Sequence, residues 1–247
     1  MGRNSIMEKQ GDSHRCLHGI ITSTLSITGL QAMVPRMCSS IQKHLQKNWQ
    51  HNKEISLYRS TKMLTFTIVL ECLFGIGIEP ETLFGVFERV LEGVLSPPVN
   101  FPGSKFSREK KARTEIEKVL ITEVRGKREE MEGGRDEEDG MLFSKLVAAL
   151  IRDEITEDEV VDNVVLLVFA AHDTTSYAIT MTFKMLATYP DCYSLLLKEH
   201  EDIARNKKPG EYLTLEDVKK MEYTWQVARE TMRLCPPIFW FLQKSNN

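Results

Sequence analysis

Five consecutive polar residues interrupt an apolar stretch whose composition otherwise predicts one long helix. They are His172, Asp173, Thr174, Thr175 and Ser176. A carboxyl group beside hydroxyl groups can pass protons between bulk water and a buried reactant, which is general acid–base chemistry. Burying such groups without partners is costly. The segment therefore predicts either a polar network that fixes helix packing, or a site where water, a proton relay or a ligand satisfies these groups.

Two small residues, Ala170 and Ala171, come directly before the polar segment. Their short side chains would let another molecule approach the helix backbone closely. Threonine hydroxyls can bond back to the carbonyl four residues earlier and bend a helix. This spacing pairs Thr174 with Ala170, and Thr175 with Ala171. The sequence thus places two alanines and two hydroxyl groups next to one another.

A second candidate pair, Glu230 and Arg233, lies in a predicted helix over 222–234 that ends before two prolines. Residues three apart share a helix face and can form an ion pair. Such pairs usually lie on the surface and contribute about 0.3–0.5 kcal/mol. We therefore assign Glu230 and Arg233 a structural role and no chemistry.

A long helix must position the polar segment. Thr156 and Glu159 have the spacing of a capping box, which marks a helix start, and no glycine or proline follows before Pro190. A helix over 157–189 would be about 50 Å long. Its first half, 160–171, is apolar on all sides apart from two polar residues, which predicts burial.

The rest of the chain also predicts helices. We expect them over 12–21, 37–49, 60–74, 81–95, 107–131, 141–152 and 191–205, with a short capped helix over 214–221. Gly29 and Pro35 are expected to break the chain between the first two helices, and 55–58 is the strand candidate. Prolines at 97–103 predict a loop. Its apolar residues Val99 and Phe101 would form a local hydrophobic plug, a lip over a ligand entry or a membrane-touching surface. The charged run 135–139 predicts a solvated linker.

The composition indicates a globular protein of the mainly α class. The chain has 247 residues, of which 42% are hydrophobic and 27% charged, so it is neither disordered nor collagen-like. A net charge of −3 predicts no nucleic-acid partner. Its five cysteines form no C-x-x-C pair, so we predict free thiols and no metal site. The longest strictly apolar run, 164–171, is far shorter than the ~20 residues of a membrane span.

The two motifs together resemble those of cytochrome P450 monooxygenases. Residues 170–175 (AAHDTT) are similar to the small–Gly–x–Asp/Glu–Thr–Thr/Ser segment of the family's distal helix. Residues 230–237 (ETMRLCPP) are similar to its E-x-x-R helix and L-x-P-P tail. The order of the two motifs along the chain and the spacing between them also match the family. Residues 101–106 resemble a loop of plant terpenoid hydroxylases, the group that includes triterpenoid and taxoid hydroxylases.

The resemblance implies that 1–247 is a partial cytochrome P450 domain from the middle of the family fold. It would run from the helix that meets the haem propionates through the E-x-x-R helix. The 247 residues contain neither the family's membrane anchor nor its F-x-x-G-x-R-x-C-x-G loop, whose cysteine binds iron. The W-x-x-x-R positions of the propionate helix fall on His14 and His18.

The resemblance further implies a role for each candidate residue. Haem would be the cofactor, contacted by Ala170, Ala171, Thr175, His14 and His18. Thr174 would guide protonation of the bound oxygen, and Asp173 would link that hydroxyl to bulk water. His172 stands at the family's variable position, where we expect a packing role. Apolar residues before Ala170, together with the Phe101 loop, would contact the substrate.

The implied function is haem-dependent hydroxylation of an apolar, terpenoid-like or steroid-like substrate. O2 would be consumed, with electrons from NADPH through NADPH–cytochrome P450 reductase. Resemblance places such an enzyme at the endoplasmic reticulum membrane, whereas the chain as given, without an anchor, would be on the cytoplasmic face or soluble. Two alternatives stay open: a truncated, inactive fragment of such an enzyme, and an unrelated helical scaffold protein.

Overall fold

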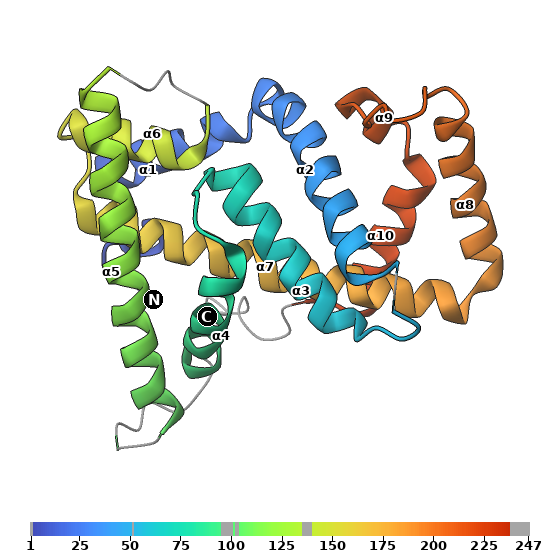
Figure 1. The fold of residues 1–247 in the computed structure, drawn as a ribbon, viewed down its shortest axis with the longest axis horizontal. Helices are drawn as coiled ribbons and strands as arrows, with labels where there is room; N and C mark the ends of the chain where they lie inside the picture. Colours follow the sequence, from blue (N-terminus) through green and yellow to red (C-terminus); the bar gives the residue numbers. More distant parts are fainter. Residues whose placement is uncertain (1, 51, 95–100, 102–103, 135–139, 238–247) are drawn as a thin grey trace, which may run out of the picture. The chain divides into compact units, whose positions relative to one another are not determined.

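The structure is a computed structural model that describes residues 2–50, 52–94, 101, 104–134 and 140–237. All regular secondary structure in these ranges is helical, which confirms the mainly α class (Figure 1). The chain divides into two compact units. Unit 1 comprises 1–33 and 66–171, and unit 2 comprises 34–65 and 172–247. Helix α7, Glu157–Thr188, continues from one unit into the other.

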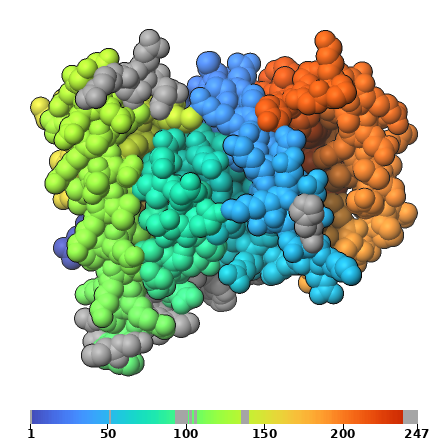
Figure 2. Space-filling view, viewed as in Figure 1, coloured from blue at the N-terminus to red at the C-terminus, as the bar shows by residue number. Residues whose placement is uncertain are grey.

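Unit 1 is built from helices around one apolar core. Its complete elements are η1 (Ile6–Glu8), α1 (Gly11–Thr24), the π-helical η2 (Val69–Phe74), α4 (Pro80–Val94), α5 (Lys105–Glu132) and α6 (Leu142–Ile151). The ring of Phe66, fully buried, meets Phe84 and Phe87 edge-on at centroid distances of 5.4 and 5.2 Å. Side chains of α4 and α5 pack directly against one another (Figure 2).

The predicted capping box at the start of α7 is confirmed. The Thr156 backbone N–H donates to Glu159 at 2.7 Å, and the Glu159 N–H donates to the Thr156 hydroxyl at 3.2 Å. Lys9 pairs with the same carboxylate at 2.6 Å. Because these bonds satisfy backbone donors at the helix start, they fix where α7 begins.

The two polar residues in the apolar half of α7 hold the N-terminal segment. Asp162 accepts the Asn4 backbone N–H at 2.9 Å and also contacts Arg113 of α5. Asn163 accepts the Ile6 N–H at 2.8 Å. Both polar side chains are buried but partnered, so they do not contradict the burial predicted for this half.

Unit 2 contains the second half of α7, most of α2 (Ile27–Asn48) and most of α3 (Leu57–Ile68). It also contains α8 (Pro190–Ala204), α9 (Leu215–Lys219) and α10 (Glu222–Leu234). The predicted cap of α9 is confirmed as a reciprocal box of Thr214 and Asp217. Glu199 of α8 accepts the backbone N–H groups of Tyr223 and Thr224 at 2.7 and 2.9 Å, which anchors the start of α10.

Two local predictions are wrong. Helix α2 runs through both Gly29 and Pro35. A Cβ at Gly29 would lie 2.0 Å from the carbonyl oxygen of Thr24, so the glycine permits close approach instead of ending the helix. Residues 55–58 form no strand, because Leu57 and Tyr58 already belong to α3. Val99 and the 135–139 linker lie outside the described residues, and Phe101 is 58% exposed.

Helix α7 is long and apolar enough to cross a membrane when judged by length and composition alone. The bent pair α1 and α2 passes the same test as one broken span. The core helix of a soluble protein also passes it, so the result is weak evidence for a span.

Candidate functional site

The polar segment of α7 has a buried face and an open face. His172 and Ser176, one turn apart, are 1% and 0% exposed. Ala170 and Thr175 are exposed, and Ala171 and Thr174 are half-buried. Residues at i and i+4 share a helix face, so the two alanines and two threonines line one side. The structure thus separates the residues predicted to contact a cofactor from the buried histidine and serine.

Helix α3 covers the buried face with two threonines. The Thr65 hydroxyl lies 3.0 Å from the His172 carbonyl oxygen. The Thr61 hydroxyl lies 3.4 Å from the Ser176 carbonyl oxygen and 3.0 Å from the hydroxyl of Thr180. Each hydroxyl also lies close to a carbonyl oxygen of α3 itself, at 2.9 Å from that of Thr61 for Thr65 and at 3.0 Å from that of Tyr58 for Thr61. The two threonines therefore place polar groups of α3 against α7 at two successive turns.

Asp173 forms an ion pair with a lysine of α3. The Lys62 ammonium lies 3.2 Å from Asp173 Oδ1, and the two side chains are 12% and 31% exposed. The ammonium also lies 5.1 Å from the ring centroid of Tyr58, a cation–π contact. Together these contacts hold a largely buried positive charge against the carboxylate.

His172 is held neutral at ordinary pH. The pKa of its imidazole is lowered to about 4, chiefly by burial; the Asp173 charge opposes the shift and the nearby Lys62 charge adds to it. A buried, neutral ring agrees with the packing role expected from the sequence. Lys62 is therefore the cation that balances the Asp173 carboxylate.

The open face of α7 continues into an apolar pocket within unit 2. Its volume is about 270 Å³. It is lined by Thr175, Ala178, Ile179, Thr182, Phe183 and Leu186 of α7, with Ala228 and Met232 of α10. Thr175 thus joins the open face to an apolar wall made by two helices.

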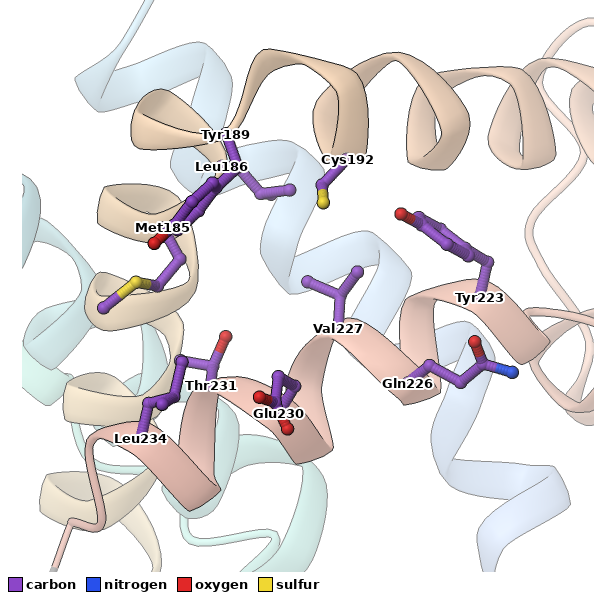
Figure 3. A pocket seen from close by; sticks show the side chains of 10 residues that line it. All are labelled: Met185, Leu186, Tyr189, Cys192, Tyr223, Gln226, Val227, Glu230, Thr231 and Leu234. Carbon is purple, nitrogen blue, oxygen red and sulfur yellow. The ribbon is translucent and has the colours of Figure 1, made fainter.

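A second pocket of unit 2, of about 380 Å³, lies between α7, α8 and α10 (Figure 3). Its lining is mostly apolar and includes Leu186, Val227 and Leu234. The Cys192 sulfur and Tyr223 hydroxyl point toward one another across it. Neither Asp173 nor Thr174 lines this pocket, so it is separate from the residues predicted to handle protons.

The predicted pair of Glu230 and Arg233 is present and exposed. The guanidinium donates two hydrogen bonds to the carboxylate, at 2.8 and 2.6 Å. These bonds lower the pKa of Glu230 and raise that of Arg233. Glu230 also lines the larger pocket.

His14 and His18 lie on α1 in unit 1. Their rings stack with centroids 5.8 Å apart, and both are exposed. The stacking follows from their i, i+4 spacing. Their predicted contact with a cofactor stays a prediction.

The predicted substrate-contacting stretch before Ala170 is largely unavailable. Val164 and Val168 are 0% exposed and belong to the core of unit 1. Only Leu167 and Phe169 are partly exposed. An all-round apolar pattern cannot distinguish a ligand wall from a packed core.

Comparison with known proteins decides the family. The family model described as "Cytochrome P450" matches residues 1–246. The chain belongs to the cytochrome P450 family. Sequence relatives within this family include plant hydroxylases. Taxane 10-beta-hydroxylase of Taxus cuspidata is 30% identical over 99% of this chain and 50% of its own length. Taxoid 14-beta-hydroxylase of Taxus cuspidata is 32% identical over 97% of this chain and 48% of its own length.

Two further comparisons support the P450 assignment. Beta-amyrin 28-monooxygenase of Barbarea vulgaris is 28% identical over 92% of this chain and 48% of its own length. The solved structure of retinoic acid bound cyanobacterial CYP120A1 superimposes with a TM-score of 0.83 at 25% identity. It is matched over 96% of this chain and 52% of its own chain. The present chain therefore has a P450-like helical fold and spans about half the length of these proteins.

The P450 family implies a haem cofactor, and the open face of α7 fits one side of it. Ala170 and Ala171 present only methyl groups, so a flat ring could approach the backbone closely. Thr174 and Thr175 add hydroxyl groups beside that surface. None of the five cysteines lies on α7. Within the described residues, this face would thus offer contacts to the ring and no thiolate ligand.

Sequence reasoning missed the contribution of α3. The 60–74 segment was interpreted only as an apolar helix, yet Thr61, Lys62 and Thr65 all contact the polar segment. Thr61 and Thr65 are four apart, a spacing that puts them on one helix face. Two hydroxyls on one face of an otherwise apolar helix are the signal that could have indicated a polar partner.

Proposed function

We propose that this chain forms the haem-distal part of a monooxygenase that hydroxylates an apolar, terpenoid-like substrate. The observation that carries the proposal is the division of α7 into two faces. One face is open and bears small side chains and hydroxyls, while the other is fixed against α3. The names of the plant relatives support the substrate class, since they include taxane, taxoid and beta-amyrin oxygenases.

Ala170, Ala171 and Thr175 would contact the haem ring in this proposal. Bound haem supplies oxygen activation and the insertion of one oxygen atom into a C–H bond. Small side chains would keep room for O2 above the ring. The apolar pocket next to Thr175 would exclude water on that side. His14 and His18 are proposed to contact the propionates.

Thr174 and Asp173 would move protons. The Thr174 hydroxyl, half-buried beside the open face, would donate a hydrogen bond toward the ring. Asp173 follows it in the relay, with a side chain that is 31% exposed and thus reached by bulk water. A partly exposed carboxyl group next to a hydroxyl-bearing residue in the chain suits proton delivery.

Further parts of the proposal rest on the family alone. NADPH–cytochrome P450 reductase would supply the electrons, and the complete enzyme would associate with the endoplasmic reticulum membrane. Glu230 and Arg233 would have a structural role.

Thr174→Ala in the complete enzyme tests the proton-delivery role. Taxanes and beta-amyrin serve as substrates, and product is measured per NADPH consumed. We expect this ratio to fall by about tenfold or more while NADPH oxidation continues. Thr188→Ala is the matched control, because it removes an exposed threonine hydroxyl of the same helix that bonds to the Lys184 carbonyl. An unchanged ratio in Thr174→Ala would refute the role.

The inactive-fragment alternative needs a separate measurement. The 247-residue chain is expressed with haem, reduced and exposed to carbon monoxide. An absorbance band at the position typical of thiolate-ligated haem would exclude that alternative. In the complete enzyme, the lack of both this band and any oxygenated product would refute the proposed function itself.

A further inference from the structure

The strongest unassigned feature is the set of α3 side chains on the polar segment of α7. Thr61, Lys62 and Thr65 lie on one side of α3, and each contacts α7 within unit 2. The contacted residues are His172, Asp173 and Ser176, so the contacts surround the proposed proton-handling carboxylate. None of these three α3 residues was predicted to belong to the site.

The backbone on both sides of Asp173 is held by hydroxyls. Thr65 contacts the carbonyl before it, at His172, and Thr61 contacts the carbonyl three residues after it, at Ser176. The Asp173 carbonyl itself accepts the Ser176 hydroxyl at 2.8 Å. Polar groups of α3 therefore lie against α7 on both sides of the aspartate.

The carboxylate is divided between two environments. Its Oδ1 is buried and faces the Lys62 ammonium at 3.2 Å. The side chain as a whole is nevertheless 31% exposed, so its exposed surface belongs to atoms other than Oδ1. The lysine therefore meets the buried oxygen of a side chain that is partly open to water.

We propose that Lys62 is a positioning residue that holds Oδ1 of Asp173 and thereby directs the rest of the carboxylate to solvent and to Thr174. The inference deepens the proposed function and rests on it for its catalytic meaning. Lys62 touches neither substrate nor cofactor in this scheme and acts only through Asp173. The contact itself is a property of the 247-residue chain and is testable without haem.

His172 reports on the contact because it lies beside both charges. We expect Lys62→Met to raise the pKa of this imidazole by about one pH unit, since a neighbouring positive charge is removed. Asp173→Asn should move it the opposite way, so that the ring stays neutral to below about pH 4. Histidine NMR titration measures both shifts. Tyr58 is the other titratable group next to Lys62 and is unchanged in both variants.

Because the two variants should shift the pKa of His172 in opposite directions, the titration distinguishes an electrostatic contact from loosened packing. Loosening would raise the pKa of His172 toward about 6.5 in both variants. Lys62→Arg should preserve the wild-type titration, and Lys184→Met, an exposed lysine of α7, is the control. A titration unchanged in Lys62→Met, or raised in both Lys62→Met and Asp173→Asn, would overturn the proposal.

The complete enzyme gives the second test. Lys62→Met should lower product per NADPH by about threefold, which is less than the loss of about tenfold or more expected for Thr174→Ala, and Lys62→Arg should restore the ratio. If the wild-type enzyme and Lys62→Met form the same amount of product per NADPH consumed, the positioning role is wrong and the proposed function survives. If the wild-type enzyme makes no product, the proposed function fails, and the His172 titration still decides whether Lys62 holds Asp173.

Discussion

His172 should make the folded chain sensitive to mild acid. The imidazole is 1% exposed, and its pKa is lowered to about 4, first by burial and then by Lys62. In the unfolded chain the same group has a pKa of about 6.5. Between these values the unfolded chain binds a proton that the folded chain does not.

The sign and size of the change in the free energy of unfolding with pH follow from proton linkage. A group that binds protons more weakly when folded gives full stability above its unfolded pKa and loses it as the pH falls. The loss ends near the folded pKa, about 4. At about 1.4 kcal/mol per pH unit, the free energy of unfolding should fall by about 2 kcal/mol between about pH 7.5 and about pH 5.

Urea unfolding of the wild type and His172→Gln at both pH values is the assay. Glutamine does not titrate, so the variant should lack this part of the pH dependence. Carboxylates with lowered pKa values, such as Glu159 and Glu199, also lose stabilisation in acid, but they do so in both proteins. Equal pH dependence in wild type and variant would refute the reasoning.

Two other predictions concern the open face and the start of α10. Ala171→Phe should fill the open face and lower haem content of the complete enzyme by about tenfold, since added bulk is poorly accommodated in a fitted site; haem absorbance per protein measures this. Ala187→Phe, on an exposed part of α7, should retain full haem content. Glu199→Ala should lower the free energy of unfolding by about 1–2 kcal/mol, because a capping acceptor is lost. Urea titration checks this, with Glu201→Ala expected to change stability by less than about 0.5 kcal/mol. If Ala171→Phe and Ala187→Phe lowered haem content equally, the role of the open face would be contradicted. If Glu199→Ala and Glu201→Ala lowered stability equally, the capping role of Glu199 would be contradicted.

The local features of the site could be predicted because they depend on residues a few positions apart. The capping boxes at Thr156 and Thr214 use a partner three residues later, as does the ion pair of Glu230 with Arg233. The length of α7 follows from the lack of glycine and proline. The P450 motifs likewise consist of short segments, so their order along the chain was enough to indicate the family.

Local preference predicted a break at Pro35 that the structure does not show. Pro35 lowers helix stability by about 3 kcal/mol when intrinsic propensity alone acts, yet α2 continues through it. The apolar residues before Ala170 were predicted to be buried and also to contact substrate; Val164 and Val168 are buried in the unit 1 core, and the substrate contact stays a prediction. Composition gives the apolar character of a side chain and does not identify the neighbour that covers it.

The sequence by itself determined that α7 carries a carboxyl group, hydroxyls and small residues at its midpoint. Only the tertiary structure decided which of them face α3 and which stay open. Thr65 contacts the carbonyl of His172, 107 positions away, and Lys62 reaches Asp173 across the same helix pair. Helical periodicity fixes which side chains share a face. The choice of partner for each face depends on contacts between segments far apart in the chain, which no local pattern records.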